Sequence, residues 1–391
     1  MTPVSVAEHL GGEDFLARVL HRDYRHLPAA VATQGLLTWG DLNRIIAGHR
    51  LEPPRLRLSR EGATLPLTSY ASPVTTHRHT VWHRLHPAEL HARLCEGASL
   101  ALDGADELHG PLARFAEGLE RRFRTRARAN VYASWTAREG FGTHWDDHDV
   151  VVVQLDGAKR WKIFGATRAH PLYRDVEQPG EPPAEPLADV VLRTGDLLYV
   201  PRGWWHAVSA DQGTRSLHVT FGLDPHTPSD LLSWLAEQLL RHEEFRADLP
   251  RLAPEADQAA FLAVLRTLLT DELRDPGLLA RYTRAVDARA PGRMAPSLPH
   301  LDGVPADRGL RVRMTTARAV LDTTSDAVLL TAAGATYEFA PAAGPVLRPL
   351  VEGHARTLGE LADAAGLDVA DVAGLVQELV EGQVVAVCEL L

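Results

Sequence analysis

The sequence predicts a mainly β core with flanking helices, followed by a helical segment and a small mixed domain. Short apolar runs broken by turn residues fill residues 130–223, and such a series is typical of a β-sandwich or barrel. After Pro225, apolar residues recur at three- and four-residue intervals, as in amphipathic helices. The 391 residues suffice for two or three domains. We assign a β domain to 1–225 with its core at 95–225, a helical domain to 226–309 and a C-terminal domain to 310–391.

The β domain is expected to begin with short helices and strands. Helical spacing predicts helices at residues 15–20 and 37–49, the second with Thr38 near its start as a cap. Alternation of apolar and polar residues predicts a strand at residues 55–59. A further helix should run over residues 87–95, because proline suits the first turn of a helix.

The core strands are expected from residue 150 onward. Val150 to Leu155 is a β-branched run bounded by Asp156 and Gly157, which predicts a buried strand that ends in a turn. The proline-rich residues 178–186 are expected to form an exposed connection, with a lid over the substrate as the alternative. Further strands are predicted at residues 161–164, 189–192, 196–200 and 216–221.

Two amphipathic helices are predicted in the helical domain, at residues 228–240 and 257–273. Their apolar stripes suit either packing on the same chain or a dimer surface. In the C-terminal domain we expect a helix, two further helices and a strand, which is the order of a winged helix. The predicted elements are strands at 311–314, 327–330 and 337–339, helices at 345–351, 358–364 (capped by Thr357) and 369–381, and a strand at 384–387.

Charge argues against nucleic-acid binding. The net charge is −10, and DNA-binding surfaces are normally basic. Residues 350–391 contain eight acidic residues, Glu389 among them, against Arg356 alone, so a DNA-binding winged helix is not expected. The five arginines within residues 121–128 are interpreted as a solvated face.

Composition also limits the kind of metal site and the compartment. The only cysteines are Cys95 and Cys388, so a disulfide framework or a cysteine zinc cluster is excluded, and any metal must be bound by histidine and carboxylate. No apolar run approaches the ~20 residues of a membrane helix. Met1 to Ser5 lacks the basic start and apolar region of a secretory signal. We therefore expect a cytoplasmic protein.

The segment Gly142 to Asp149 carries the first candidate metal ligands. In an extended chain His144 and Asp146 point to the same side. A second, distant histidine would complete the set of two histidines and one carboxylate that leaves open positions on Fe(II). His148 lies on the same side, so spacing alone leaves it as an alternative ligand, and Asp147 and Asp149 also compete.

A second histidine is marked by its position. Pro201, Arg202 and Gly203 form a predicted turn after a strand, and His206 begins the next strand. This layout would hold an imidazole at the mouth of a barrel. The alternative is a histidine that merely packs beside two tryptophans.

Five blocks of the chain, taken together and in order, resemble the cupin-like JmjC oxygenases of the ribosomal-oxygenase group. The resemblance implies a double-stranded β-helix, or cupin jelly roll, with a helical dimerisation segment and a winged-helix-like C-terminal domain. Thr143 and Trp145 depart from the family pattern, which commonly has a proline and a smaller aromatic residue there. The blocks are residues 130–132, 140–149, 154–161, 195–206 and 216–220.

The resemblance also implies roles for particular residues. It places the metal triad on His144, Asp146 and His206, in preference to His148. It places the contact to the distal carboxylate of 2-oxoglutarate on Lys159, one of only two lysines in the chain. Further contacts to this co-substrate fall on Asn130 and Thr220.

The implied activity is that of an Fe(II)- and 2-oxoglutarate-dependent dioxygenase, with O2 as the other co-substrate. Such an enzyme would hydroxylate an amino-acid residue in a protein, with ribosomal proteins as the class that the resemblance indicates, and would release succinate and CO2. A homodimer without DNA or membrane partners is expected. The alternatives are a hydroxylase of a biosynthetic peptide or small metabolite, and a non-catalytic metal-cupin or winged-helix binding protein.

Overall fold

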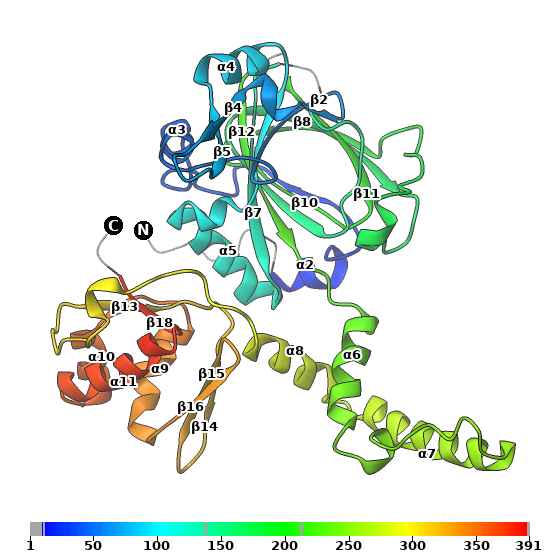
Figure 1. Cartoon of the computed structure of the whole chain (residues 1–391), viewed down its shortest axis with the longest axis vertical. Helices are drawn as coiled ribbons and strands as arrows, with labels where there is room; N and C mark the ends of the chain where they lie inside the picture. Colours follow the sequence, from blue (N-terminus) through cyan, green and yellow to red (C-terminus); the bar gives the residue numbers. More distant parts are fainter. Residues whose placement is uncertain (1–9, 11, 137–138, 212–213, 389–391) are drawn as a thin grey trace. The chain divides into compact units, whose positions relative to one another are not determined.

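A computed structural model describes residues 10, 12–136, 139–211 and 214–388. The predictions that concern Met1 to Ser5 and Glu389 lie outside these ranges. The chain divides into two compact units, residues 1–225 and 226–391 (Figure 1).

The first unit is built on one ten-stranded sheet in which all the recorded strand pairs are antiparallel. Its strands run in the order β1-β10-β8-β12-β7-β6-β2-β3, and β9 and β11 also pair with β8. They curl around into a barrel-like core (Figure 1), which confirms the predicted architecture. The strands are β1 (Arg25–Leu27), β2 (Leu56–Arg60), β3 (Ala63–Thr64), β6 (Ser99–Leu102), β7 (Ala127–Ser134), β8 (Asp149–Ala166), β9 (Ala188–Arg193), β10 (Leu197–Val200), β11 (Trp204–Ala210) and β12 (Ser216–Leu223).

Strand β8 is the central strand of this core, and its course shows that one prediction is wrong. It continues through Asp156 and Gly157, where the sequence predicted a turn, and runs for 18 residues. Its first part pairs with β10 and β12, and its second part with β9 and β11. Gly157 has a φ of +70°, and a Cβ there would lie 1.9 Å from the Arg215 carbonyl oxygen. The glycine therefore redirects the strand between two sets of partners instead of ending it.

Helices cover the sheet, and most of their apolar residues join its core. Thr38 caps α3 (Trp39–Gly48), as predicted, and does so through the reciprocal hydrogen bonds with Asp41 that make up a capping box. Helix α4 (Pro87–Cys95) has the predicted bounds, and α2 (Gly12–Arg18) lies slightly earlier than expected. The sequence did not predict α5 (Gly110–Phe123), which packs against β7 (Figure 1), or the hairpin of β4 (Ala71–Thr75) and β5 (Val81–Leu85).

The second unit begins with α6 (Pro228–Leu239), α7 (Glu255–Arg274) and α8 (Leu278–Ala288). Thr227 caps α6 by a second capping box. A small core joins Leu235 and Leu239 to Leu278. Helix α7 has no buried residue, so its apolar side chains pack little within the described parts of the unit.

The remainder of this unit has its own apolar core. Two three-stranded sheets, β17-β13-β18 and β14-β15-β16, accompany three helices. The helix, helix, helix and strand follow in the predicted order, and the winged-helix assignment stays a prediction. No described helix has the length and apolar character needed to cross a bilayer. The elements are β13 (Arg311–Met314), β14 (Val320–Thr323), β15 (Val328–Ala332), β16 (Ala335–Phe339), α9 (Gly344–Val351), β17 (Arg356–Thr357), α10 (Leu358–Ala365), α11 (Val369–Glu381) and β18 (Val385–Val387).

Candidate active site

Two stretches of chain that are distant in sequence meet at the candidate metal site. The backbone N–H of His144 donates to the carbonyl of His206 at 3.1 Å, and the N–H of His206 donates back at 2.7 Å. The N–H of Gly203 also donates to the Asp146 carbonyl at 2.9 Å. These bonds bring the beginning of β11 beside residues 144–146.

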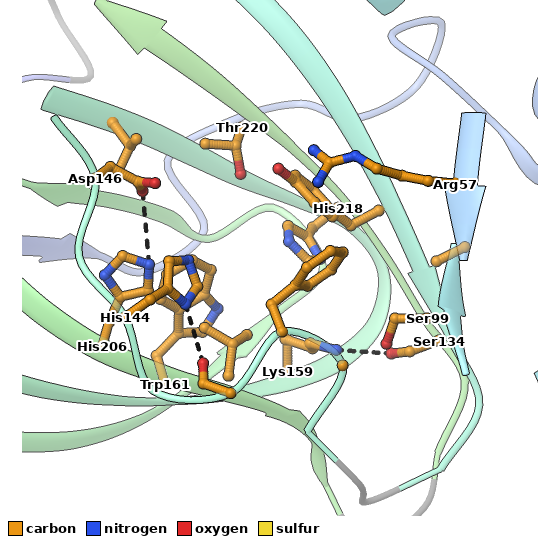
Figure 2. A pocket seen from close by; sticks show the side chains of 17 residues that line it. Arg57, Ser99, Ser134, His144, Asp146, Lys159, Trp161, His206, His218 and Thr220 are labelled. Carbon is orange, nitrogen blue, oxygen red and sulfur yellow. Dashed lines mark hydrogen bonds and ion pairs between the residues drawn. The ribbon is translucent and has the colours of Figure 1, made fainter. Parts of the chain in front are cut away.

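The side chains of His144, Asp146 and His206 converge (Figure 2). Each offers a ligand atom, and these atoms lie within 4.8 Å of one another. The Nδ1 atoms of the two histidines lie 3.0 Å from the Gly142 carbonyl and 3.1 Å from the Trp204 carbonyl. A ring that donates from Nδ1 to a carbonyl leaves Nε2 as a lone pair for a metal.

The electrostatics of the triad suit a divalent cation. Burial, together with the neighbouring His144, lowers the pKa of His206 to about 4. Burial alone would raise the pKa of Asp146, but the nearby imidazoles of His206 and His144 outweigh it and hold that pKa below its usual value. A neutral His206 and an ionised carboxylate are therefore available at neutral pH, and this donor set fits Fe(II).

The alternative ligands near the triad have other partners. His148 Nδ1 lies 2.8 Å from an oxygen of Asp147, and its ring lies where a Cβ on Gly222 would approach it to 2.7 Å. Asp149 accepts hydrogen bonds from the Tyr199 hydroxyl and the Arg202 N–H. The structure thus brings together the three residues that the resemblance implied and leaves His148 outside the group.

Lys159 lines the same cavity as the triad, which encloses about 280 Å³. It comes from β8 and is 4% exposed, and its Nζ donates to the Ser134 hydroxyl at 2.7 Å (Figure 2). Burial lowers its pKa to about 8. The described residues supply no carboxylate partner for this ammonium, so an anionic ligand would compensate its buried charge.

Comparison with known proteins relates part of the first unit to a known family. The family model described as the JmjC domain matches residues 108–231. Residues 108–231 of this chain are therefore similar to a JmjC domain. Ribosomal oxygenase 1 of Gallus gallus is 32% identical over 48% of this chain and 33% of its own length. The bifunctional lysine-specific demethylase and histidyl-hydroxylase NO66 of Dictyostelium discoideum is 29% identical over 47% of this chain and 37% of its own length.

A structural likeness covers more of the chain than these sequence matches, which span about a third of each curated relative. The ribosomal oxygenase YcfD of Escherichia coli, in complex with cobalt and 2-oxoglutarate, is 19% identical with a TM-score of 0.61. The match covers 96% of this chain and 98% of that one. At this identity the likeness shows a shared fold.

The two further predicted co-substrate contacts lie on neighbouring strands. Thr220 of β12 lines the cavity near the triad (Figure 2). Asn130 of β7 is its partner across the ladder, but its side-chain oxygen accepts the Gly104 N–H at 3.0 Å. Asn130 is not among the lining residues of the cavity, so its role stays a prediction.

His218 is a site residue that the sequence analysis missed. It is 5% exposed, lines the cavity and stacks on Tyr132 with ring centroids 5.1 Å apart. Burial and the adjacent Lys159 lower its pKa well below the ordinary value, so the ring is neutral. Its Nδ1 has no hydrogen-bond partner among the described residues. Residues 218 and 220 alternate on one face of β12, which is the sequence signal that could have identified it.

Arg57 and Ser134 were also missed. Arg57 lies on β2 and reaches the cavity on the side away from the triad (Figure 2), with Asp103 as its ion-pair partner at 3.0 Å. Ser134 is the hydrogen-bond partner of Lys159. Neither pairing is visible in the sequence, because both join residues on strands that only folding brings together.

Proposed function

We propose that the protein is an Fe(II)- and 2-oxoglutarate-dependent dioxygenase that hydroxylates an amino-acid residue of a protein, releasing succinate and CO2. The observation that supports this most strongly is one cavity that contains both a His-Asp-His group and a buried lysine with no carboxylate partner among the described residues. A scaffold protein would need no buried cation there, because burying an uncompensated charge is costly.

The triad of His144, Asp146 and His206 would hold Fe(II), since two imidazoles and one carboxylate leave positions open for other ligands. When bound, ferrous iron supplies the activation of O2 that is coupled to oxidative decarboxylation of 2-oxoglutarate. The protein contributes the ionised state of Asp146 and the neutral state of His206, so protons compete little with the metal at neutral pH.

Lys159 would bind the distal carboxylate of 2-oxoglutarate. A charge-assisted hydrogen bond of this kind is worth about 1.5–3 kcal/mol, and a compact ammonium suits a single carboxylate. Ser134 orients Nζ, and the neutral His218 lies beside it. Thr220 and Asn130 are proposed as further co-substrate contacts.

A protein substrate, with ribosomal proteins as the first class to test, is supported by the names of the relatives. Those names describe a ribosomal oxygenase and a histidyl-hydroxylase. The test is mass spectrometry of cellular proteins from a deletion strain complemented with the wild type or with His144→Ala. We expect a one-oxygen mass increase on a protein that requires His144. His148→Ala, which alters a neighbouring histidine outside the triad, should retain the modification.

Two outcomes would count against this assignment. A modification that survives His144→Ala would contradict the catalytic role of the triad. A one-oxygen increase found only on peptides or small metabolites, and on no protein, would contradict the protein substrate while leaving the oxygenase assignment intact.

We also propose that a second copy of the chain packs on the helical segment. The support is α7, which has no buried residue and exposes Leu262, Val264 and Leu273 by 61%, 43% and 50%. Sedimentation should show a dimer for the wild type and a monomer for Leu262→Glu. A wild type that sediments as a monomer would contradict this proposal.

A further inference from the structure

Two tryptophans adjoin the three triad residues along the chain. Trp145 stands between the first two of them, and Trp205 immediately precedes the third. Both are buried, at 6% and 2% exposure, and they pack with Phe164 and Ala207 in a small cluster. Neither indole is among the residues that line the cavity. Because consecutive side chains of an extended chain face opposite ways, the indoles lie behind the triad.

Both indole N–H groups donate to the same segment, residues 167–187, which joins β8 to β9. Trp205 Nε1 donates to the Thr167 hydroxyl at 2.8 Å. Trp145 Nε1 donates to the Pro179 carbonyl at 3.1 Å. Each of the two stretches that carry triad residues is therefore attached to this segment from behind.

A third contact and an internal ion pair hold the segment in place. Pro171 packs closely on Gly203, because a Cβ added at Gly203 would lie 2.6 Å from the ring of Pro171. Gly203 in turn donates to the Asp146 carbonyl. Arg168 and Asp175 form an ion pair at 2.7 Å within the segment.

From this arrangement we propose that residues 167–187 act as a clamp that fixes the two triad-bearing stretches relative to each other. Trp145 and Trp205 are its positioning residues. This inference rests on the proposed metal site. The two stretches are joined directly by the backbone bridge between His144 and His206, and the clamp adds a second link through the two indole hydrogen bonds.

The clamp gives the proline-rich part of the segment a role beyond that of a connector. Prolines restrict the backbone and reduce the conformational entropy of the unfolded chain. The Pro179 carbonyl can therefore be held in place for the indole at small entropic cost. Groups that orient the ligands of a metal typically contribute 10- to 100-fold in metal affinity, and we expect the clamp to act through this effect.

The test is calorimetric titration of the full-length chain with Co(II). Trp145→Phe removes one indole N–H and keeps an aromatic ring. Thr167→Val removes the acceptor of Trp205 with little change of shape and leaves the ligand-bearing stretches unaltered. Each should raise the Kd for Co(II) by roughly 10- to 100-fold. Adding Trp205→Phe to Thr167→Val should weaken binding no further than Trp205→Phe alone, because both remove the same hydrogen bond.

Two controls separate the clamp from general destabilisation. Trp39→Phe removes an equivalent indole bond, to Asp156 at 2.7 Å on another part of the domain. Tyr173→Ala alters a side chain of the clamp that is 82% exposed. Both should bind Co(II) as the wild type does.

The outcomes distinguish the clamp from the metal site itself. Unchanged Co(II) affinity in Trp145→Phe and Thr167→Val, or an equal loss in Trp39→Phe, would overturn the clamp. Wild-type affinity no better than that of His144→Ala would overturn the metal site and the clamp with it. Circular dichroism of the metal-free variants checks folding, and Thr167→Val decides the matter if an indole variant does not fold.

Discussion

At the scale of single residues, the triad and its neighbour His148 give a sharp contrast. Asp146 supplies the only anionic ligand of the group, whereas His148 is paired with Asp147. Asp146→Ala should therefore abolish activity and weaken Fe(II) binding, and His148→Ala should retain the metal. Anaerobic Fe(II) titration measures both. Loss of metal in His148→Ala with retention in Asp146→Ala would reverse the ligand assignment.

Lys159 should matter for 2-oxoglutarate more than for iron. If its ammonium contributes about 1.5–3 kcal/mol to the contact with a carboxylate, Lys159→Ala should raise the KM for 2-oxoglutarate by roughly 10- to 100-fold. The Fe(II) affinity of this variant should stay close to that of the wild type. Lys162, the other lysine of the chain, lies outside the cavity lining, so Lys162→Ala is the matched control. Equal effects of the two substitutions would contradict the anchor.

Lys159 should also make the stability of the ligand-free protein depend on pH. Burial lowers the pKa of Lys159 to about 8, while an unfolded lysine titrates near 10.4. At pH values between these two pKa values the unfolded chain binds more protons than the folded chain, so the free energy of unfolding rises with pH. The contribution is on the order of 3 kcal/mol. Urea denaturation between pH 7 and about 10 should show this rise in the wild type and a smaller one in Lys159→Met.

At the scale of elements, the bend of β8 depends on one glycine. Gly157→Ala places a Cβ 1.9 Å from the Arg215 carbonyl at a φ of +70°. Gly180→Ala meets a similar φ of +80° with no atom within 4 Å, so it isolates the cost of backbone strain, about 1–2 kcal/mol. Gly157→Ala should lower the free energy of unfolding by clearly more than Gly180→Ala. Equal losses in urea denaturation would show that the close approach is unimportant.

The element scale also shows how far the sequence could predict the fold. Thr38 and Pro87 predict the helices that begin at them, because the preferences for capping and first-turn residues are local to the helix end. At Gly157 the sequence predicts a turn, because an Asp-Gly pair after a strand fits a hairpin equally well. Only the close approach of the Arg215 carbonyl distinguishes the observed bend from a turn. For residues 121–128 the sequence predicts a solvated face. The structure divides them between the end of α5 and the beginning of β7, and Arg124, Arg126 and Arg128 are exposed.

The candidate site shows the same division between local and long-range information. His144 and Asp146 were marked by alternation within three residues, which a strand geometry makes meaningful. The resemblance places the 2-oxoglutarate contact on Lys159, and the rarity of lysine in this chain adds to that signal, but its partner Ser134 lies 25 residues away on another strand. For His218 the one local signal is its alternation with Thr220 on β12, and its burial beside Lys159 appears only in the folded structure.

At the scale of the whole molecule, charge predicts which partners are excluded. The chain carries a net charge of −10, and the C-terminal residues 350–391 contribute a single arginine. Binding to duplex DNA depends on cations that release counterions. The full-length protein should therefore give no mobility shift with duplex DNA at moderate ionic strength. A shift that weakens as salt increases would support a DNA-binding winged helix instead.

The central claim is that the cavity containing the triad and Lys159 is a 2-oxoglutarate oxygenase site. Succinate formation from 2-oxoglutarate tests it most directly, measured by NMR with Fe(II) and O2 for the wild type, His206→Ala and His148→Ala. We predict succinate release by the wild type and by His148→Ala, including slow uncoupled turnover without a protein substrate, and none by His206→Ala. Absence of succinate in the wild type when iron binding is demonstrated, or equal release by His206→Ala, would contradict the claim.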